Sequence, residues 1–105
     1  MMTVTVLAII ESDTIPAAPL SKVMNERLRR FAAELQDKHL KDLDLLDPDC
    51  EDVVIYLGYD SKYNVRWKIV NDVSAAIESE VARHCALLGY VLWKGSTIYN
   101  FNSRN

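Results

Sequence analysis

The chain has 105 residues, with fifteen acidic against twelve basic side chains and a formal net charge of −3. This length fits one domain with one core, so we predict a single α+β domain over residues 1–105. Half of the residues are apolar and a quarter are charged, which excludes a disordered or fibrous chain. The negative charge argues against broad electrostatic binding to nucleic acid or to an anionic membrane surface.

The cysteines and the first residues of the chain bear on its compartment. Cys50 and Cys85 are too few for a disulfide scaffold and suit free thiols in a reducing environment. The apolar run that ends at Ile10 has no basic residue before it and is too short to span a bilayer. We therefore expect a cytoplasmic protein that does not associate with membranes.

The first half of the chain predicts a strand followed by a long helix. Residues 3 to 10 are β-branched and apolar on both alternating faces, which is typical of a strand covered on two sides. Residues 11 to 20 carry two prolines and are expected to form a connection. From 21 to 43, apolar residues recur at close to the helical period, and they are Met24, Leu28, Phe31, Leu35, Leu40 and Leu43.

The second half predicts a hairpin, a helix and a final strand region. Residues 53–59 and 63–70 flank a short polar segment that suits a turn between antiparallel strands. Asn71 or Asp72 is expected to cap a helix that ends before Gly89. Residues 90 to 101 are strand-like and interrupted at Gly95, which indicates one bulged strand or a small hairpin.

The order of these elements, βαββαβ with an additional C-terminal strand as the alternative, predicts a ferredoxin-like plait. Such a plait is an antiparallel sheet with two helices on one face. Two helices leave the second face open, yet residues 3–10 and 53–57 are apolar on both faces. We therefore expect a homo-oligomer in which a second copy of the chain covers the sheet face.

The sequence offers no recognisable catalytic motif, so we predict a protein without enzymatic activity, cofactor or metal. The three glycines stand alone, which excludes a phosphate loop or a dinucleotide fingerprint. The histidines and cysteines lack metal-ligand spacing. Two weaker alternatives are a Cys85 nucleophile with His39 as base, and a ligand-regulated domain that uses Ser12 to Thr14 after the first strand.

The densest signal is an acidic segment, residues 42–52, which we call the acidic run. It contains six acidic side chains and no base: Asp42, Asp44, Asp47, Asp49, Glu51 and Asp52. It lacks the spacing of a calcium-binding loop, and it is either solvated surface or a site for a basic partner surface. Our leading hypothesis is a non-enzymatic interaction module, such as an acidic inhibitor, immunity protein, antitoxin or phage-encoded antagonist of a nucleic-acid-handling protein.

The alternative is a plait that binds nucleic acid on its open sheet. Arg66 and Lys68 lie on the wetter face of the second hairpin strand, and Tyr56 and Tyr63 are near in sequence. Basic and aromatic side chains on such a sheet can hold phosphates and stack on bases. The strand lacks the Gly-and-aromatic pattern of an RNA-recognition strand, and Trp67 alternates onto the core face. These residues therefore form the second hypothesis.

Overall fold

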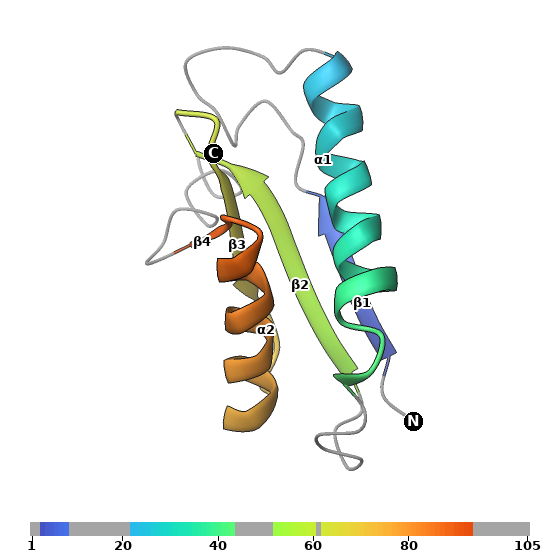
Figure 1. Ribbon diagram of the computed structural model, residues 1–105, viewed down its shortest axis with the longest axis vertical. Coiled ribbons are helices and arrows are strands. Elements are labelled where there is room, and N and C mark those ends of the chain that lie inside the picture. The colour runs from blue at the N-terminus through green and yellow to red at the C-terminus, as the bar shows by residue number, and fades with distance from the viewer. Residues whose placement is uncertain (1–2, 9–21, 44–51, 61, 94–105) are drawn as a thin grey trace, which may run out of the picture.

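A computed structural model of the chain describes residues 3–8, 22–43, 52–60 and 62–93. The elements in chain order are β1 (Thr3–Ala8), α1 (Lys22–Glu34), a π-helical segment η2 (Leu35–His39), β2 (Asp52–Tyr59), β3 (Val65–Ile69), α2 (Ala75–Leu87) and β4 (Val91–Leu92). The strands form one sheet in the order β1-β2-β3-β4. Both helices lie on the same face of that sheet (Figure 1).

The sheet is mixed. β1 pairs in parallel with β2, β2 pairs antiparallel with β3, and β3 pairs in parallel with β4. The predicted α+β class is confirmed, but the predicted ferredoxin-like order and antiparallel sheet are wrong for the described residues. A plait would separate β1 from β2 by another strand. Here each helix returns the chain so that the next strand starts beside the previous one, which gives two parallel pairs joined by a hairpin.

The core lies between the helices and one sheet face. Alternate residues of β2, namely Val53, Ile55 and Leu57, are each 0% exposed, as expected for side chains that share one face of a strand. They pack in a single cluster with the buried residues of both helices, which include Leu28, Leu35, Ile77, Val81 and Cys85. Each large apolar side chain buried in this way stabilises the fold by roughly 1.5–3 kcal/mol.

The first helix changes its hydrogen-bonding pattern before it ends. The Leu40 N–H donates to the Leu35 carbonyl at 3.0 Å, a five-residue step that defines a π-turn. In this segment Gln36 Oε1 accepts from the Val6 N–H at 2.9 Å. Gln36 therefore ties the end of the helix to the edge strand β1. The apolar stripe predicted for residues 21–43 is correct, since Leu40 is buried. The predicted single helix is too long, because α1 ends at Glu34 and the π-helical segment ends at His39.

The start of α2 differs from the prediction. Ser74 is the N-cap, and its Oγ accepts from the Ile77 N–H at 3.3 Å. Asn71 instead bonds to β2, because its Oδ1 accepts from the Val54 N–H at 3.0 Å and its Nδ2 donates to the Asp52 carbonyl at 2.8 Å. Asn71 thus holds the segment that follows β3 against the start of β2, and Asp72 is exposed.

The end of α2 follows the prediction. Gly89 has φ +80°, the left-handed conformation that commonly ends a helix at glycine. The Gly89 N–H donates to Ala86 at 3.0 Å, and the Tyr90 N–H donates to Cys85 at 2.8 Å. The Tyr90 ring packs with Phe31 of α1, with 5.9 Å between centroids. The chain then enters β4, and the predicted strand residues after Trp93 lie outside the described residues.

Candidate interaction surface

The sheet has a second face, opposite the helices, which we call the helix-free face. Strand alternation and the pairing register place these residues on it: Thr5, Leu7, Val54, Tyr56, Gly58, Arg66, Lys68, Val70 and Val91. Neither α1 nor α2 packs against it, because their buried side chains belong to the core cluster of the other face.

Apolar side chains are unevenly buried on the two faces. On the helix-free face Leu7 is 45% exposed, Val70 is 40% exposed and Val91 is 47% exposed, and Val54 and Tyr56 between them are half-buried. On the core face Val53, Ile55 and Leu57 of β2 are 0% exposed, whereas Leu92 of β4 is 43% exposed. Exposed apolar side chains gathered on one surface mark interaction sites in soluble proteins.

Trp93 packs on part of the helix-free face. Its side chain is 2% exposed and contacts Tyr56, and its ring lies over Gly58 so closely that a Cβ there would fall under 3.0 Å from two ring atoms. The backbone N–H of Trp93 donates to the Trp67 carbonyl at 2.7 Å. A glycine is therefore needed at position 58 for the Trp93 ring to pack against the strand. A lone glycine within a strand can indicate such a close approach.

The structure brings together three of the four residues predicted to bind nucleic acid. Tyr56 and Lys68 are paired neighbours on the helix-free face, and Arg66 follows on the same side of β3. Tyr63 lies instead at the hairpin turn, where its ring meets Tyr59 with 6.3 Å between centroids. Trp67 is 5% exposed in the core, as its alternation predicted.

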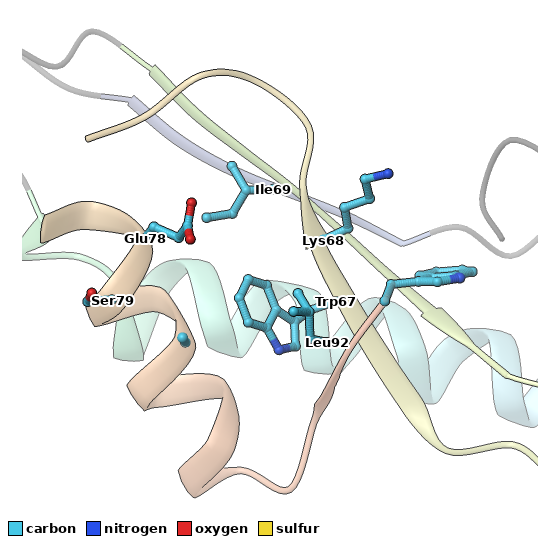
Figure 2. A pocket seen from close by; sticks show the side chains of 8 residues that line it. Trp67, Lys68, Ile69, Glu78, Ser79 and Leu92 are labelled. Carbon is cyan, nitrogen blue, oxygen red and sulfur yellow. The ribbon is translucent and has the colours of Figure 1, made fainter. Parts of the chain in front are cut away.

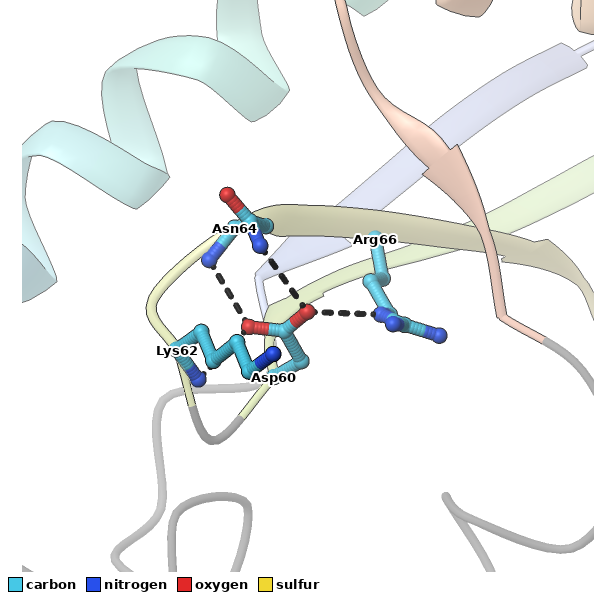
Figure 3. Close-up of polar contacts among 4 residues, drawn as sticks. All are labelled: Asp60, Lys62, Asn64 and Arg66. Atoms are coloured by element: carbon cyan, nitrogen blue, oxygen red, sulfur yellow. Dashed lines mark hydrogen bonds and ion pairs between the residues drawn. The ribbon is translucent and has the colours of Figure 1, made fainter.

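Asp60 organises the hairpin turn and forms an ion pair with Arg66 (Figure 3). Its carboxylate accepts from the N–H groups of Lys62 at 2.8 Å and Asn64 at 2.9 Å, and from Arg66 Nε at 3.0 Å. Burial raises the pKa of Asp60, but these hydrogen bonds together outweigh it, so the pKa lies below the ordinary value. The Arg66 charge is therefore balanced within the chain.

The same turn holds a left-handed residue that is not glycine. The Tyr63 N–H donates to the Asp60 carbonyl at 2.9 Å, and Tyr63 has φ +64°. Hairpin loops of this length commonly end on a left-handed residue, usually glycine, that forms a bulge. The Asp60 hydrogen bonds and the Tyr59 ring hold Tyr63 in this conformation. The predicted turn is correct, and its left-handed residue is one that the sequence did not indicate.

The acidic run is described only at its two ends. Asp42 follows η2 and Asp52 begins β2, and both side chains are exposed. By strand alternation Asp52 lies on the same side of β2 as Tyr56, at the edge of the helix-free face. The other predicted partner-binding residues, Asp44, Asp47, Asp49 and Glu51, lie outside the described residues.

The alternative nucleophile lies in the core. Cys85 is 0% exposed, and burial raises the pKa of its thiol to about 12. The His39 ring packs beside His84, with 6.1 Å between centroids, and His84 Nε2 is 3.0 Å from Glu80 Oε1. Within the described ranges, no group of three or more His, Cys, Asp or Glu side chains could hold a metal ion. The Ser12 to Thr14 loop lies outside those ranges.

A pocket of about 350 Å³ lies between α2, β4 and the outer side of β3 (Figure 2). Trp67, Ile69 and Leu92 line it from the sheet, and Glu78 and Ala82 line it from α2. The described part of β4 pairs with Arg66 and Trp67, beside the pocket. Sequence reasoning missed this pocket because it depends on how α2 lies against the sheet edge.

The chain was compared with protein-family models, curated proteins and solved structures, and none of the three comparisons found a match. In the part of the chain that the structure describes, neither helix is long and apolar enough to cross a bilayer.

Proposed function

We propose that the chain is a non-enzymatic protein-interaction module and that the helix-free face is its docking surface. The observation that carries the proposal is the contrast between the two faces of one sheet. The core face of β2 is packed to 0% exposure at Val53, Ile55 and Leu57, and the helix-free face of the sheet presents Leu7, Val70 and Val91 at 40% exposure or more. Docking removes these apolar side chains from water, at roughly 25 cal/mol for each Å² buried.

The state of Cys85 argues against the alternative in which its thiol acts as a nucleophile. A thiol whose pKa is about 12 is protonated at neutral pH, and the thiolate is the reactive form in nucleophilic catalysis. His39 has the imidazole of His84 as its ring neighbour. The Cys85 and His39 pair predicted as an alternative therefore has neither an accessible nor an activated nucleophile.

The charges of the helix-free face favour a second copy of the chain as its occupant. Asp52 lies at the start of β2, six positions before Gly58, which pairs with Arg66; this is roughly 20 Å along the strand. Lys68 lies between these positions, opposite Tyr56. A two-fold axis across the strands would set Asp52 of each copy near Lys68 of the other. A partner of a single charge sign would match only one end.

The test is the oligomeric state measured by analytical ultracentrifugation. We expect a reversible dimer, and we expect Leu7→Lys to weaken it tenfold or more, since a charge would be buried without a partner. Leu87→Lys is the matched control, because Leu87 is 73% exposed on α2 and lies away from this face. A wild-type chain that stays monomeric at about 1 mM, where even weak association is populated, would contradict the proposal.

A charge exchange tests the two-fold arrangement itself. Asp52→Lys and Lys68→Glu should each weaken the dimer by about two- to fivefold, the scale of one exposed ion pair. The double variant should recover most of the wild-type affinity, because the charges are again complementary. Additive losses in the double variant would show that the two ends do not face each other.

The acidic run adds a second element to the proposed function. Asp42 and Asp52 are exposed at its ends, and acidic surface speeds association with a basic partner. We therefore propose that the assembled chain inhibits a partner with a basic surface, such as a nucleic-acid-handling protein. Asn replacements at Asp44, Asp47 and Asp49, which leave Asp52 of the proposed dimer interface unchanged, should weaken that complex and reduce the salt dependence of its affinity. Unchanged affinity for the purified partner would remove this element.

Nucleic-acid binding is the second candidate, favoured by the gathering of Tyr56, Arg66 and Lys68 on one face. The Asp60 ion pair balances Arg66, and Trp93 is too buried to stack on a base. A fluorescent single-stranded RNA would decide between the candidates. Binding that weakens steeply with salt and is lost in Lys68→Glu would support this role, and no binding at low salt would exclude it.

A further inference from the structure

The pocket beside α2 has an apolar interior. Trp67, Ile69 and Leu92 line it from the sheet and Ala82 lines it from the helix. Leu92 is 43% exposed and Ile69 is half-buried, so both present apolar surface to an incoming group. A volume of about 350 Å³ lies at the lower end of the range for ligand sites, and it suits one large side chain better than a whole cofactor.

One carboxylate stands at the mouth of this pocket. Glu78 is exposed on the first turn of α2, and its side chain lies beside Ile69 at the pocket (Figure 2). Arg66 pairs with Asp60, and Arg83 and His84 pair with Glu80, whereas Glu78 takes part in none of these ion pairs. Lys68 also borders the pocket but leaves β3 on the opposite side from Glu78. The free charge on the helix side of the mouth is therefore negative.

We infer that this pocket takes a leucine-sized apolar side chain from a partner segment that carries a lysine or arginine next to it. The apolar walls would bury the anchor, and Glu78 would receive the flanking cation. The inference rests on the proposed function only in that the ligand is a protein segment. Its walls come from α2 and the edge of β3, and Lys68 and Trp93 of the helix-free face border it. Leu7 does not line the pocket, so Leu7→Lys tests the helix-free face separately.

The chain carries its own reporter of pocket occupancy. It has two tryptophans, Trp67 and Trp93, and both line the pocket. Their indole N–H groups give two resonances in a heteronuclear NMR spectrum of the full chain. The probe is the peptide acetyl-Lys-Leu-Lys-amide, with acetyl-Lys-Ala-Lys-amide and acetyl-Glu-Leu-Glu-amide as matched comparisons.

We expect the Lys-Leu-Lys peptide to shift at least one indole resonance saturably, with a dissociation constant on the order of 1 mM. The Lys-Ala-Lys peptide should bind about tenfold or more weaker, because it loses the buried methyl and methylene groups. The Glu-Leu-Glu peptide should bind about two- to fivefold weaker. Equal shifts with the alanine peptide, or no shift with the leucine peptide, would overturn the inference.

Two variants locate the site without disturbing the core. Glu78→Gln should abolish the preference for lysine over glutamate peptides, and Ser79→Phe should block the mouth, since Ser79 lines the pocket and is exposed. Glu26→Gln on the exposed side of α1 is the matched control and should change nothing. Full binding by the folded Ser79→Phe variant would place the peptide elsewhere and overturn the inference.

Other occupants give distinct results in the same spectra. Indole shifts caused by Phe101→Ser without peptide would assign the pocket to the chain's own C-terminal residues. Indole shifts that follow protein concentration alone and persist in Leu7→Lys would assign it to a second copy. Either result overturns the inference. Peptide binding by a strictly monomeric chain would support the pocket and contradict the dimer of the helix-free face. A dimer that does not bind the peptide would support the dimer and overturn the pocket.

Discussion

Gly58 is the position where one added methyl group tests the packing of the helix-free face. A Cβ at this residue would lie under 3.0 Å from two atoms of the Trp93 ring, closer than real Cβ atoms approach side-chain carbons. In a strand with no such neighbour, replacing glycine by alanine stabilises by roughly 0.5–1 kcal/mol, because glycine loses more conformational freedom on folding. The Trp93 ring should reverse this sign.

The size of the effect depends on what the Trp93 ring does. If the ring shifts within its site, the cost is that of overpacking, about 1–3 kcal/mol. If it is expelled, the protein loses a side chain that is only 2% exposed, and the cost rises toward the 3–5 kcal/mol typical of removing a buried tryptophan. We expect Gly58→Ala to lower the free energy of unfolding by about 1–3 kcal/mol, because a partial shift avoids the larger loss.

Urea denaturation followed by far-ultraviolet circular dichroism measures this change. The same substitution is also made in a Trp93→Ala background, where alanine at position 58 meets no ring and should be neutral or slightly stabilising. The two losses are therefore expected to be strongly non-additive. A loss below about 0.5 kcal/mol, or an equal loss in both backgrounds, would refute the contact between Trp93 and Gly58.

The remaining predictions concern the turn, the helix cap and the thiol. Asp60→Asn should cost about 1–3 kcal/mol in a denaturation experiment. The folded-state pKa of Asp60 lies below its ordinary 3.8. The stabilisation by its carboxylate is therefore complete above pH 3.8 and is lost as the pH falls through the folded pKa. This part of the acid-induced loss of stability should be absent from the Asp60→Asn variant. Ser74→Ala should cost about 1 kcal/mol and Asp72→Ala almost nothing, since Ser74 is the cap. In a Cys50→Ser background, Cys85 should resist a thiol reagent at pH 8 until the chain unfolds; rapid native labelling would refute its burial.

Local patterns predicted the elements well. The four-residue spacing of Met24 and Leu28 predicted α1, and Gly89 after an apolar stripe predicted the end of α2. Alternation in β3 predicted that Trp67 would be buried with Arg66 on the other face. These features depend on neighbours within a few residues, so the sequence carries them directly.

The candidate site was only partly predictable. The open sheet face was predicted because two helices can cover only one face of a sheet. Arg66 and Tyr56 were correctly predicted to lie on the same face. The packing of Trp93 on Gly58 and the pocket beside Glu78 were missed, because each joins residues far apart in sequence. Asn71 was assigned to the wrong partner for the same reason, since its side chain bonds to β2 rather than to the helix that follows it.

The sequence by itself determined the order of the two α-helices and four strands in the described residues, because hydrophobic period, turn residues and a terminal glycine act locally. It did not indicate the π-helical segment η2. Tertiary structure alone decided which strands are neighbours. The same order of elements is compatible with the predicted plait and with the observed order β1-β2-β3-β4. The choice between them is made by pairing and packing between segments such as β1 and β2, which the chain brings together across more than forty residues, and such contacts leave no local pattern.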